Sequence, residues 1–344
     1  MSEEIIIYEE ATIGQLFVGA IGEDGFFNND RLIEVSPAIN EILPTFFLKS
    51  FRQKDFFSFT HELDVEYNGA FASCRKLFEE PEAFLQESQN LLKLLYSVSE
   101  NDNIKEGELY IAYFPLLNVG GEETDAVGIF KSEDRDPFIK VFQEGQSLGL
   151  MQDEGISIHN INKGALILNS EEVKNYKVLV FDKTNKQSPA RFWIDHFLNL
   201  KPLEDEFFQT KNFMRMCKDF ALGQNEMDRS EQVDMINRSV EYFQEHEHFN
   251  QEEFQREVLP EADQRQAFMD FQNQFVEKHE MEEMPEDFEI SQPAFKATKR
   301  YIRSVIKLDK NFHVYVHGKK EMIERGYDEE KGKHYYKLYF DEEL

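Results

Sequence analysis

The stretch KGALILNSEEVKNYKVLVFDKTNKQSPARFWIDHFLNL (Lys163–Leu200) contains two short apolar runs followed by a helix signal. The runs GALILN (Gly164–Asn169) and YKVLVFD (Tyr176–Asp182) are rich in aliphatic residues and are bounded by polar turn residues, which is typical of β-strands. In SPARFWIDHFL (Ser188–Leu198), serine is a suitable N-cap and the proline after it suits the first helical turn. The stretch therefore predicts two strands and then a helix.

Four more short apolar runs come before this stretch, and turn residues separate them. They are ELYIAYF (Glu108–Phe114), DAVGIFK (Asp125–Lys131), FIKVF (Phe138–Phe142) and GISIH (Gly155–His159). Six short strands with short connections favour an antiparallel or mixed sheet over alternating strands and helices. Helices are predicted after Pro37 and from Pro81 to about Ser99, where large apolar residues recur at helical spacing. We therefore expect residues 1–203 to form an α+β domain.

Residues 204–292 have no convincing strand and are rich in Glu, Gln, Asp, Phe and Met. Apolar residues recur at helical spacing in three segments, Phe207–Leu222, Val233–Phe243 and Phe268–Phe275. This part of the chain has 8 basic and 24 acidic residues. The pattern predicts a helical subdomain with an acidic outer face.

Residues 293–344 reverse the charge, with 12 Lys and Arg against 9 Asp and Glu. In FKATKRYIRSVIKLDK (Phe295–Lys310) the cations recur three or four residues apart, so a helix would carry them as one stripe with Lys299 beside it. The segments NFHVYVHG (Asn311–Gly318) and KHYYKLYF (Lys333–Phe340) suggest a small antiparallel sheet. The prediction is a basic helix followed by antiparallel strands.

The composition indicates a folded protein of the cytoplasm. Hydrophobic residues make up 41% of the 344 residues and include 33 Phe, which is enough for a core. Cys74 and Cys217 are far apart, so a disulfide framework or a structural zinc site is not expected. No apolar run approaches the ~20 residues of a membrane span, and the first residues lack the pattern of a secretory signal.

The net charge of −29 restricts the partners that the chain can bind. Such a charge repels nucleic acid on average, and affinity for DNA comes largely from Lys and Arg that neutralise phosphates. The charge is uneven, however: it is −32 before Pro293 and +3 from there on. Direct DNA contact therefore requires the local basic surface, which could instead be a solvated face that pairs with the chain's own acidic helices.

We find no motif that indicates catalysis. The chain lacks GxxxxGK[ST], HExxH and GxSxG, and no GxGxxG lies between a strand and a helix. The run HEHF (His246–Phe249), near Glu241 and Glu245, places two histidines on different helix faces, which favours a polar helix end over a metal site. His196 follows Asp195 but has no candidate nucleophile near it. We expect no catalytic residue, metal or cofactor; a hydrolase or nuclease would need acids that converge only in the fold.

Two segments, Lys163–Leu200 and SQPAFKATKRYIRSVIKLDKNFHVYVHG (Ser291–Gly318), resemble the bacterial nucleoid-associated protein family. The resemblance implies a cytoplasmic, non-catalytic protein that is found with the nucleoid and binds double-stranded DNA without sequence specificity. The candidate DNA-binding residues are the cations around these two segments. They are Lys183, Lys186, Arg191, Lys296, Lys299, Arg300, Arg303, Lys307 and Lys310.

An alternative function stays open at this point. The acidic residues of 204–292 could engage basic faces of DNA-bound proteins, so that the chain reaches the nucleoid through protein partners. A homodimer is a further option, because a basic face could then continue across two copies.

Overall fold

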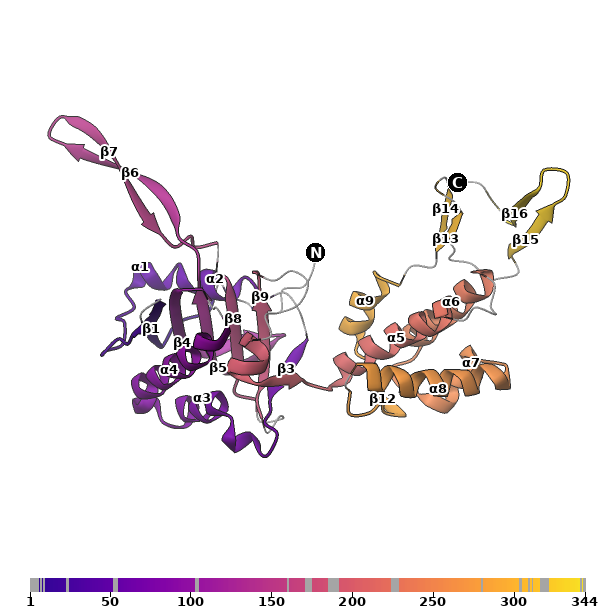
Figure 1. The fold of residues 1–344 in the computed structure, drawn as a ribbon, viewed down its shortest axis with the longest axis horizontal. Coiled ribbons are helices and arrows are strands. Elements are labelled where there is room, and N and C mark those ends of the chain that lie inside the picture. Colours follow the sequence, from indigo (N-terminus) through magenta and orange to yellow (C-terminus); the bar gives the residue numbers. More distant parts are fainter. Residues whose placement is uncertain are drawn as a thin grey trace. The chain divides into compact units, whose positions relative to one another are not determined.

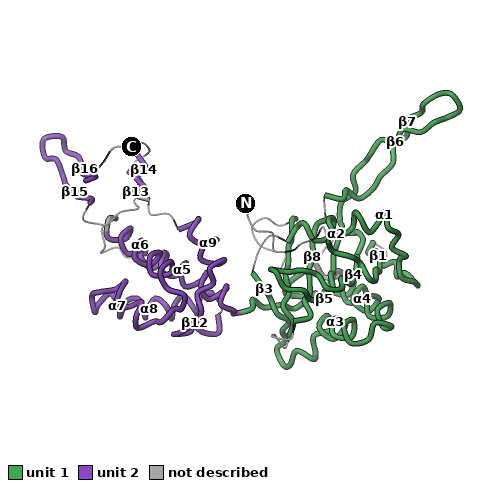
Figure 2. Tube along the Cα trace, turned by 180° about the vertical axis from the view of Figure 1, so that it is seen from behind, with its two compact units in different colours: residues 1–203 green, residues 204–344 purple. Residues whose placement is uncertain are grey.

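The computed structural model of the chain describes residues 6, 8, 10–22, 25–51, 55–102, 105–159, 161–170, 175–184, 192–223, 229–279, 281–302, 305–308, 310, 312–315, 322–340 and 342. These form two compact units, unit 1 (residues 1–203) and unit 2 (residues 204–344), which Figure 2 shows in separate colours. The two predicted regions 204–292 and 293–344 thus lie in the same unit. Helices and antiparallel strands are both abundant, so the predicted α+β fold class is confirmed.

Unit 1 is built on an open antiparallel sheet of eight strands (Figure 1). The strand order is β10-β3-β9-β8-β5-β4-β1-β2. The strands are β1 (Gln15–Gly22), β2 (Gly25–Phe27), β3 (Phe56–Phe59), β4 (Gly107–Val119), β5 (Glu122–Ser132), β8 (Lys163–Leu168), β9 (Lys177–Asp182) and β10 (Leu200–Pro202). Four of the predicted strands are confirmed as adjacent strands of this sheet, namely those at 108–114, 125–131, 164–169 and 176–182, which correspond to β4, β5, β8 and β9.

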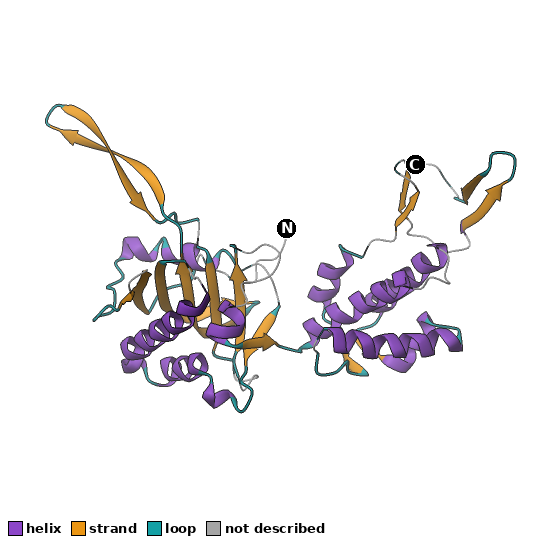
Figure 3. Cartoon of the chain, viewed as in Figure 1, coloured by secondary structure: helices purple, strands orange, loops and turns teal. Residues whose placement is uncertain are grey.

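The sheet of unit 1 buries both of its faces, because successive side chains of a strand point to opposite sides. In β4, Leu109 and Ile111 face one core, whereas Ala112 and Phe114 face the other. Helices cover both faces, as Figure 3 shows. The first core is covered by α3 (Gly69–Glu79), α4 (Phe84–Asp102) and the π-helical turn η3 (Phe192–Leu198), and the second by α2 (Leu43–Leu48).

The helices of unit 1 begin where the sequence supplies caps. The short helix α1 (Pro37–Asn40) starts at a serine, whose Oγ accepts a hydrogen bond from Ile39 N, and has proline at its first position. The predicted helix from Pro81 to Ser99 is confirmed as a 3-10 turn followed by α4. Asn68 caps α3, and its Nδ2 also donates to Leu198 O at 2.9 Å. One buried amide thus joins α3 to the end of η3.

A two-stranded ribbon projects from unit 1 between β5 and β8 (Figure 1). Its strands, β6 (Asp136–Glu144) and β7 (Ser147–Gly155), pair with each other and with no other strand of the described residues. The run FIKVF is therefore a strand, but it lies outside the eight-stranded sheet. The strand predicted at GISIH is wrong: pairing stops at Gly155, and Ile156 turns toward the core beside α2.

Unit 2 packs its helices around an aromatic core. Phe213 lies at its centre, with ring centroids of Phe249 and Phe254 at 4.2 and 5.2 Å. The helices are α5 (Glu206–Gly223), α6 (Arg229–Glu245), α7 (Gln251–Val258), α8 (Ala262–Lys278) and α9 (Gln292–Lys299). The helical spacing predicted α5, α6 and α8 correctly.

The expectation that residues 204–292 hold no strand is wrong. Two three-residue strands, β11 (His248–Asn250) and β12 (Asp287–Glu289), pair with each other. They are too short to leave a periodic pattern in the sequence, and the stacking of Phe249 on Phe288 fixes them to the core.

The end of the chain forms two separate hairpins. Strand β13 (Val305–Leu308) pairs with β14 (Phe312–Tyr315), and β15 (Ile323–Asp328) pairs with β16 (Lys333–Leu338). The predicted pairing of 311–318 with 333–340 is therefore wrong, since each strand pairs with the segment directly before it. Ile306 of β13 and Val233 of α6 are buried together, which attaches the hairpins to the helices.

Candidate nucleic-acid interface

The basic segment that follows Ser291 is helical only over its first part. Ser291 Oγ accepts a hydrogen bond from Ala294 N at 3.4 Å, and a proline occupies the first turn of α9. The helix ends at Lys299 with Arg300 as its C-cap, so the helix predicted over Phe295–Lys310 is wrong beyond that residue. Ile306 is 1% exposed, and the pairing of β13 with β14 draws the chain into a strand. Tertiary packing thus overrides the helical spacing of the cations.

Three predicted cations are brought together by α9. Lys296, Lys299 and Arg300 are exposed and are spaced three and four residues apart, which places them on one face of the helix. Each also lies near the helix C-terminus, where the partial negative charge of the helix dipole favours cations.

The other cations of the predicted stripe are not in line with these. Lys307 lies in β13, where its backbone is paired with His313. Lys310 is exposed at the turn between β13 and β14. Arg303 lies outside the described residues. A single five-cation stripe on one helix is therefore wrong.

A fourth cation, Lys218 of α5, lies beside the end of α9. Its Nζ donates to Tyr301 O at 3.3 Å, although 83 residues separate the two in the sequence. Lys299 Nζ donates to Gln244 Oε1 at 2.7 Å and lies 5.3 Å from the ring of Phe295. We call Lys218, Lys296, Lys299 and Arg300 the α9 cation group. Sequence spacing could not reveal Lys218, because α5 and α9 meet only in the fold.

Of the three cations predicted in unit 1, one, Lys183, lies within the described residues. Lys183 is exposed at the end of β9, where its Nζ donates to His159 O at 3.5 Å and lies 5.8 Å from the ring of Phe181. Lys186 and Arg191 lie outside the described residues.

Next to Lys183, unit 1 buries an ionic network that sequence reasoning missed. Lys131 Nζ and Lys163 Nζ both donate to Glu133 Oε1, and Lys163 Nζ also donates to Thr184 Oγ1 at 2.9 Å. Burial lowers the pKa of Lys131, and the carboxylate of Glu133 opposes that shift. These lysines are 0% and 3% exposed, so they neutralise a buried carboxylate and do not face a ligand in solution.

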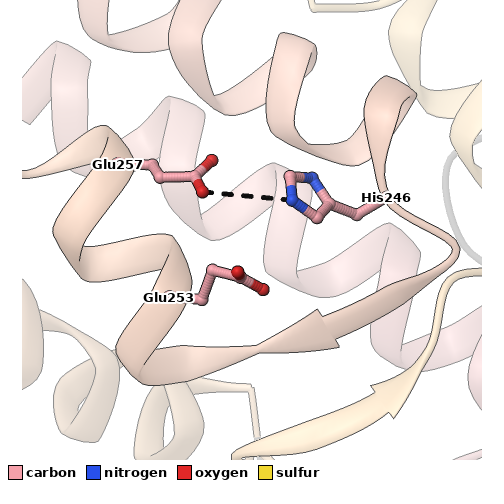
Figure 4. Close-up of side chains that lie close together, drawn as sticks. All are labelled: His246, Glu253 and Glu257. Atoms are coloured by element: carbon pink, nitrogen blue, oxygen red, sulfur yellow. Dashed lines mark ion pairs between the residues drawn. The ribbon is translucent and has the colours of Figure 1, made fainter.

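A histidine and two glutamates meet on the surface of unit 2 (Figure 4). His246, Glu253 and Glu257 place their ligand atoms within 4.8 Å of one another, with His246 Nε2 4.0 Å from Glu257 Oε1. The ring of His246 stacks on Tyr242 at 4.2 Å. Imidazole and carboxylates are donors that zinc accepts. His246 and Glu253 are half-buried, and Glu257 is exposed.

A small pocket lies between α5 and α6 and is lined by Met214, Cys217, Ile236 and Ile302, among others. Its cavity volume of about 10 Å³ is far below the ~300–1,000 Å³ of typical ligand sites. None of the helices formed by the described residues is long and apolar enough to cross a bilayer.

The fold and these contacts define an acidic α+β protein that carries three exposed cations close together at one short helix of its second unit. Residues 22–334 match the family model of nucleoid-associated protein YejK. The chain therefore belongs to this nucleoid-associated family, which confirms the resemblance seen in the sequence and supports a role at the nucleoid. A search of curated proteins found no match.

Proposed function

We propose that this protein is a non-catalytic nucleoid protein that binds double-stranded DNA without sequence specificity through the α9 cation group. The observation that supports the proposal is the position of Lys296, Lys299 and Arg300 on one exposed helix face, in a chain of net charge −29. Cations on a rigid helix can contact phosphates without reading base edges. Membership of the nucleoid-associated family supports the same function.

The charge distribution sets the expected strength of the contact. The cations of unit 2 attract the DNA phosphates, whereas the acidic remainder of the chain repels the duplex. We therefore expect weak binding that is confined to a small surface. Tyr301, 78% exposed beside Arg300, could add stacking or hydrogen bonding to the backbone contacts.

The experiment compares two triple charge reversals by fluorescence anisotropy with a short labelled duplex. The test variant is K296E/K299E/R300E, and the control is K49E/K93E/K278E, which reverses three exposed cations elsewhere. Both variants change the net charge equally. We expect the test variant to lose at least about tenfold in affinity and the control to lose much less. Equal losses in the two variants, or no loss in the test variant, would overturn the assignment of the site; circular dichroism checks that both are folded.

A second candidate function is contact with DNA-bound proteins. It is favoured by the 24 acidic residues of 204–292, several of them exposed on α6 and α7. Deleting this region would remove the aromatic core around Phe213, so surface substitutions are the better probe. If this function holds, the purified protein does not bind bare DNA at physiological salt, and E241Q/E245Q/E252Q weakens capture by basic nucleoid proteins.

A further inference from the structure

The ribbon of β6 and β7, which we call the arm, exposes large apolar side chains along its whole length. Every residue of β6 is exposed. A two-stranded hairpin is only marginally stable by itself in water, and soluble monomers seldom expose a contiguous apolar surface of this kind. The exposed apolar residues are Phe138, Ile139, Val141, Phe142, Leu148, Leu150 and Met151.

The register of the arm sorts these residues onto two faces. Val141 lies opposite Leu150, and residues directly opposite in an antiparallel pair share a face. Ile139 and Leu148 belong to the same face, because they are two residues away along their strands. These four side chains, which are 59–78% exposed, form the aliphatic face of the arm.

The opposite face is better protected by the arm itself. The ring of Phe142 lies over Gly149, and that of Phe138 lies beside Gly155. These two phenylalanines are 37% and 46% exposed, less than any residue of the aliphatic face. The aliphatic face is thus the part of the arm that most needs a partner.

We propose that a second copy of this chain covers the aliphatic face, with each copy's arm docked on the other in a symmetric dimer. This inference does not rest on the proposed DNA binding.

The charges on the arm argue against DNA as the partner and permit a second copy. From Asp136 to Gly155 the chain has four acidic residues and a single cation, Lys140, so the arm repels phosphates. Two copies with a net charge of −29 also repel each other, and an interface between them must avoid that charge. The aliphatic face does so over most of its length, since its four aliphatic residues, Gln143 and Gln152 are uncharged and its one acidic residue, Glu154, lies at the base of the arm.

The size of the arm favours a reciprocal contact. Nine residues per strand give a length of about 30 Å, and two strands give a width of about 10 Å, so each face offers roughly 300 Å². One aliphatic face docked on an unrelated protein would therefore bury about 300 Å² of this chain, well below the ~800 Å² per partner of a standard interface. In a symmetric exchange each copy also contributes the surface that receives the partner's arm, so the two copies together bury roughly 1,200 Å², the lower end of the ~1,200–2,000 Å² total of stable interfaces.

The test measures the oligomeric state of the full chain by sedimentation velocity over a range of concentrations. The variant L148K/L150K places two charges on the aliphatic face, and both positions are already exposed at 78% and 72%. The control L63K/L338K adds the same charge at leucines that are 81% and 50% exposed elsewhere. We expect the wild type and the control to dimerise and the arm variant to dissociate at least about tenfold more readily.

Salt gives a second readout. Because the two copies repel each other and their contact is apolar, we expect the dimer to tighten when salt rises from about 0.05 to about 0.5 M. A monomeric wild type would overturn the proposal, and capture of a different protein by that monomer would identify another occupant. Dimerisation of L148K/L150K with wild-type affinity would also overturn it. DNA binding is measured separately, so either proposal can fail without the other.

Discussion

The Nζ atoms of Lys131 and Lys163 donate to the same carboxylate oxygen, Glu133 Oε1, at 2.9 and 2.7 Å. All three side chains are at most 3% exposed. Asp182 Oδ1 lies 3.9 Å from Lys163 Nζ and supplies a second negative charge. Two buried ammonium groups are thus neutralised by two carboxylates, Glu133 directly after β5 and Asp182 at the end of β9.

Replacing Glu133 by Gln should destabilise unit 1 strongly. The substitution leaves two ammonium groups buried with one fewer anion, which costs about 3–5 kcal/mol in comparable sites. Urea unfolding followed by circular dichroism measures the loss. Glu122→Gln, at an exposed position of β5, is the control and should change stability by less than about 0.5 kcal/mol. A similar stability for the two variants would show that the network is not needed.

Gly107 should not tolerate a side chain. Its φ of +147° is unfavourable for other residues, and a Cβ there would lie 1.9 Å from Ser132 O. Gly120, with a φ of +67°, has open space around it. We expect Gly120→Ala to cost about 1–2 kcal/mol and Gly107→Ala clearly more, because only the latter must also displace backbone. Thermal melting of both variants tests this, and equal melting temperatures would contradict it.

His279 should make unit 2 less stable in mild acid. Burial lowers its pKa below 6.5, and Arg215 and Lys278 lower it further. As pH falls through about 6.5, the unfolded state therefore binds more protons than the folded state, and stability decreases. His279→Gln removes this contribution. Between about pH 7.5 and 5.5 the urea midpoint of the variant should fall less than that of the wild type, and parallel curves would rule out a role for His279.

DNA binding should weaken with salt in proportion to the phosphates contacted. Each contact contributes about 0.9 to the slope of log affinity against log salt. K296E/K299E/R300E should therefore reduce the magnitude of that slope by about 3. The slope of K49E/K93E/K278E should stay near the wild-type value. The arm dimer should respond in the opposite direction, which separates the two interactions in one salt series.

Much of the fold follows from local patterns in the sequence. Helices α4, α5, α6 and α8 were predicted because their apolar residues recur on one helical face, and each such face packs on a core. Strands β4, β5, β8 and β9 were predicted because short aliphatic runs suit a sheet that is covered on both faces. Lys296, Lys299 and Arg300 could be placed on one face for the same reason, since helical spacing holds as far as Arg300.

The sequence by itself thus determined the α+β class, the family and the uneven charge, because these depend on composition and on spacing within single elements. Where a segment's local pattern fits more than one structure, only the tertiary structure decided which one forms. Residues 305–308 leave the helical pattern because Ile306 is buried against Val233 and β14 offers backbone partners. FIKVF forms part of the arm and not of the eight-stranded sheet. Lys218 joins the α9 cation group because α5 packs on α9. Ile306 and Lys218 have partners far away in the chain, which spacing along the sequence does not encode, whereas the arm pairs only with itself.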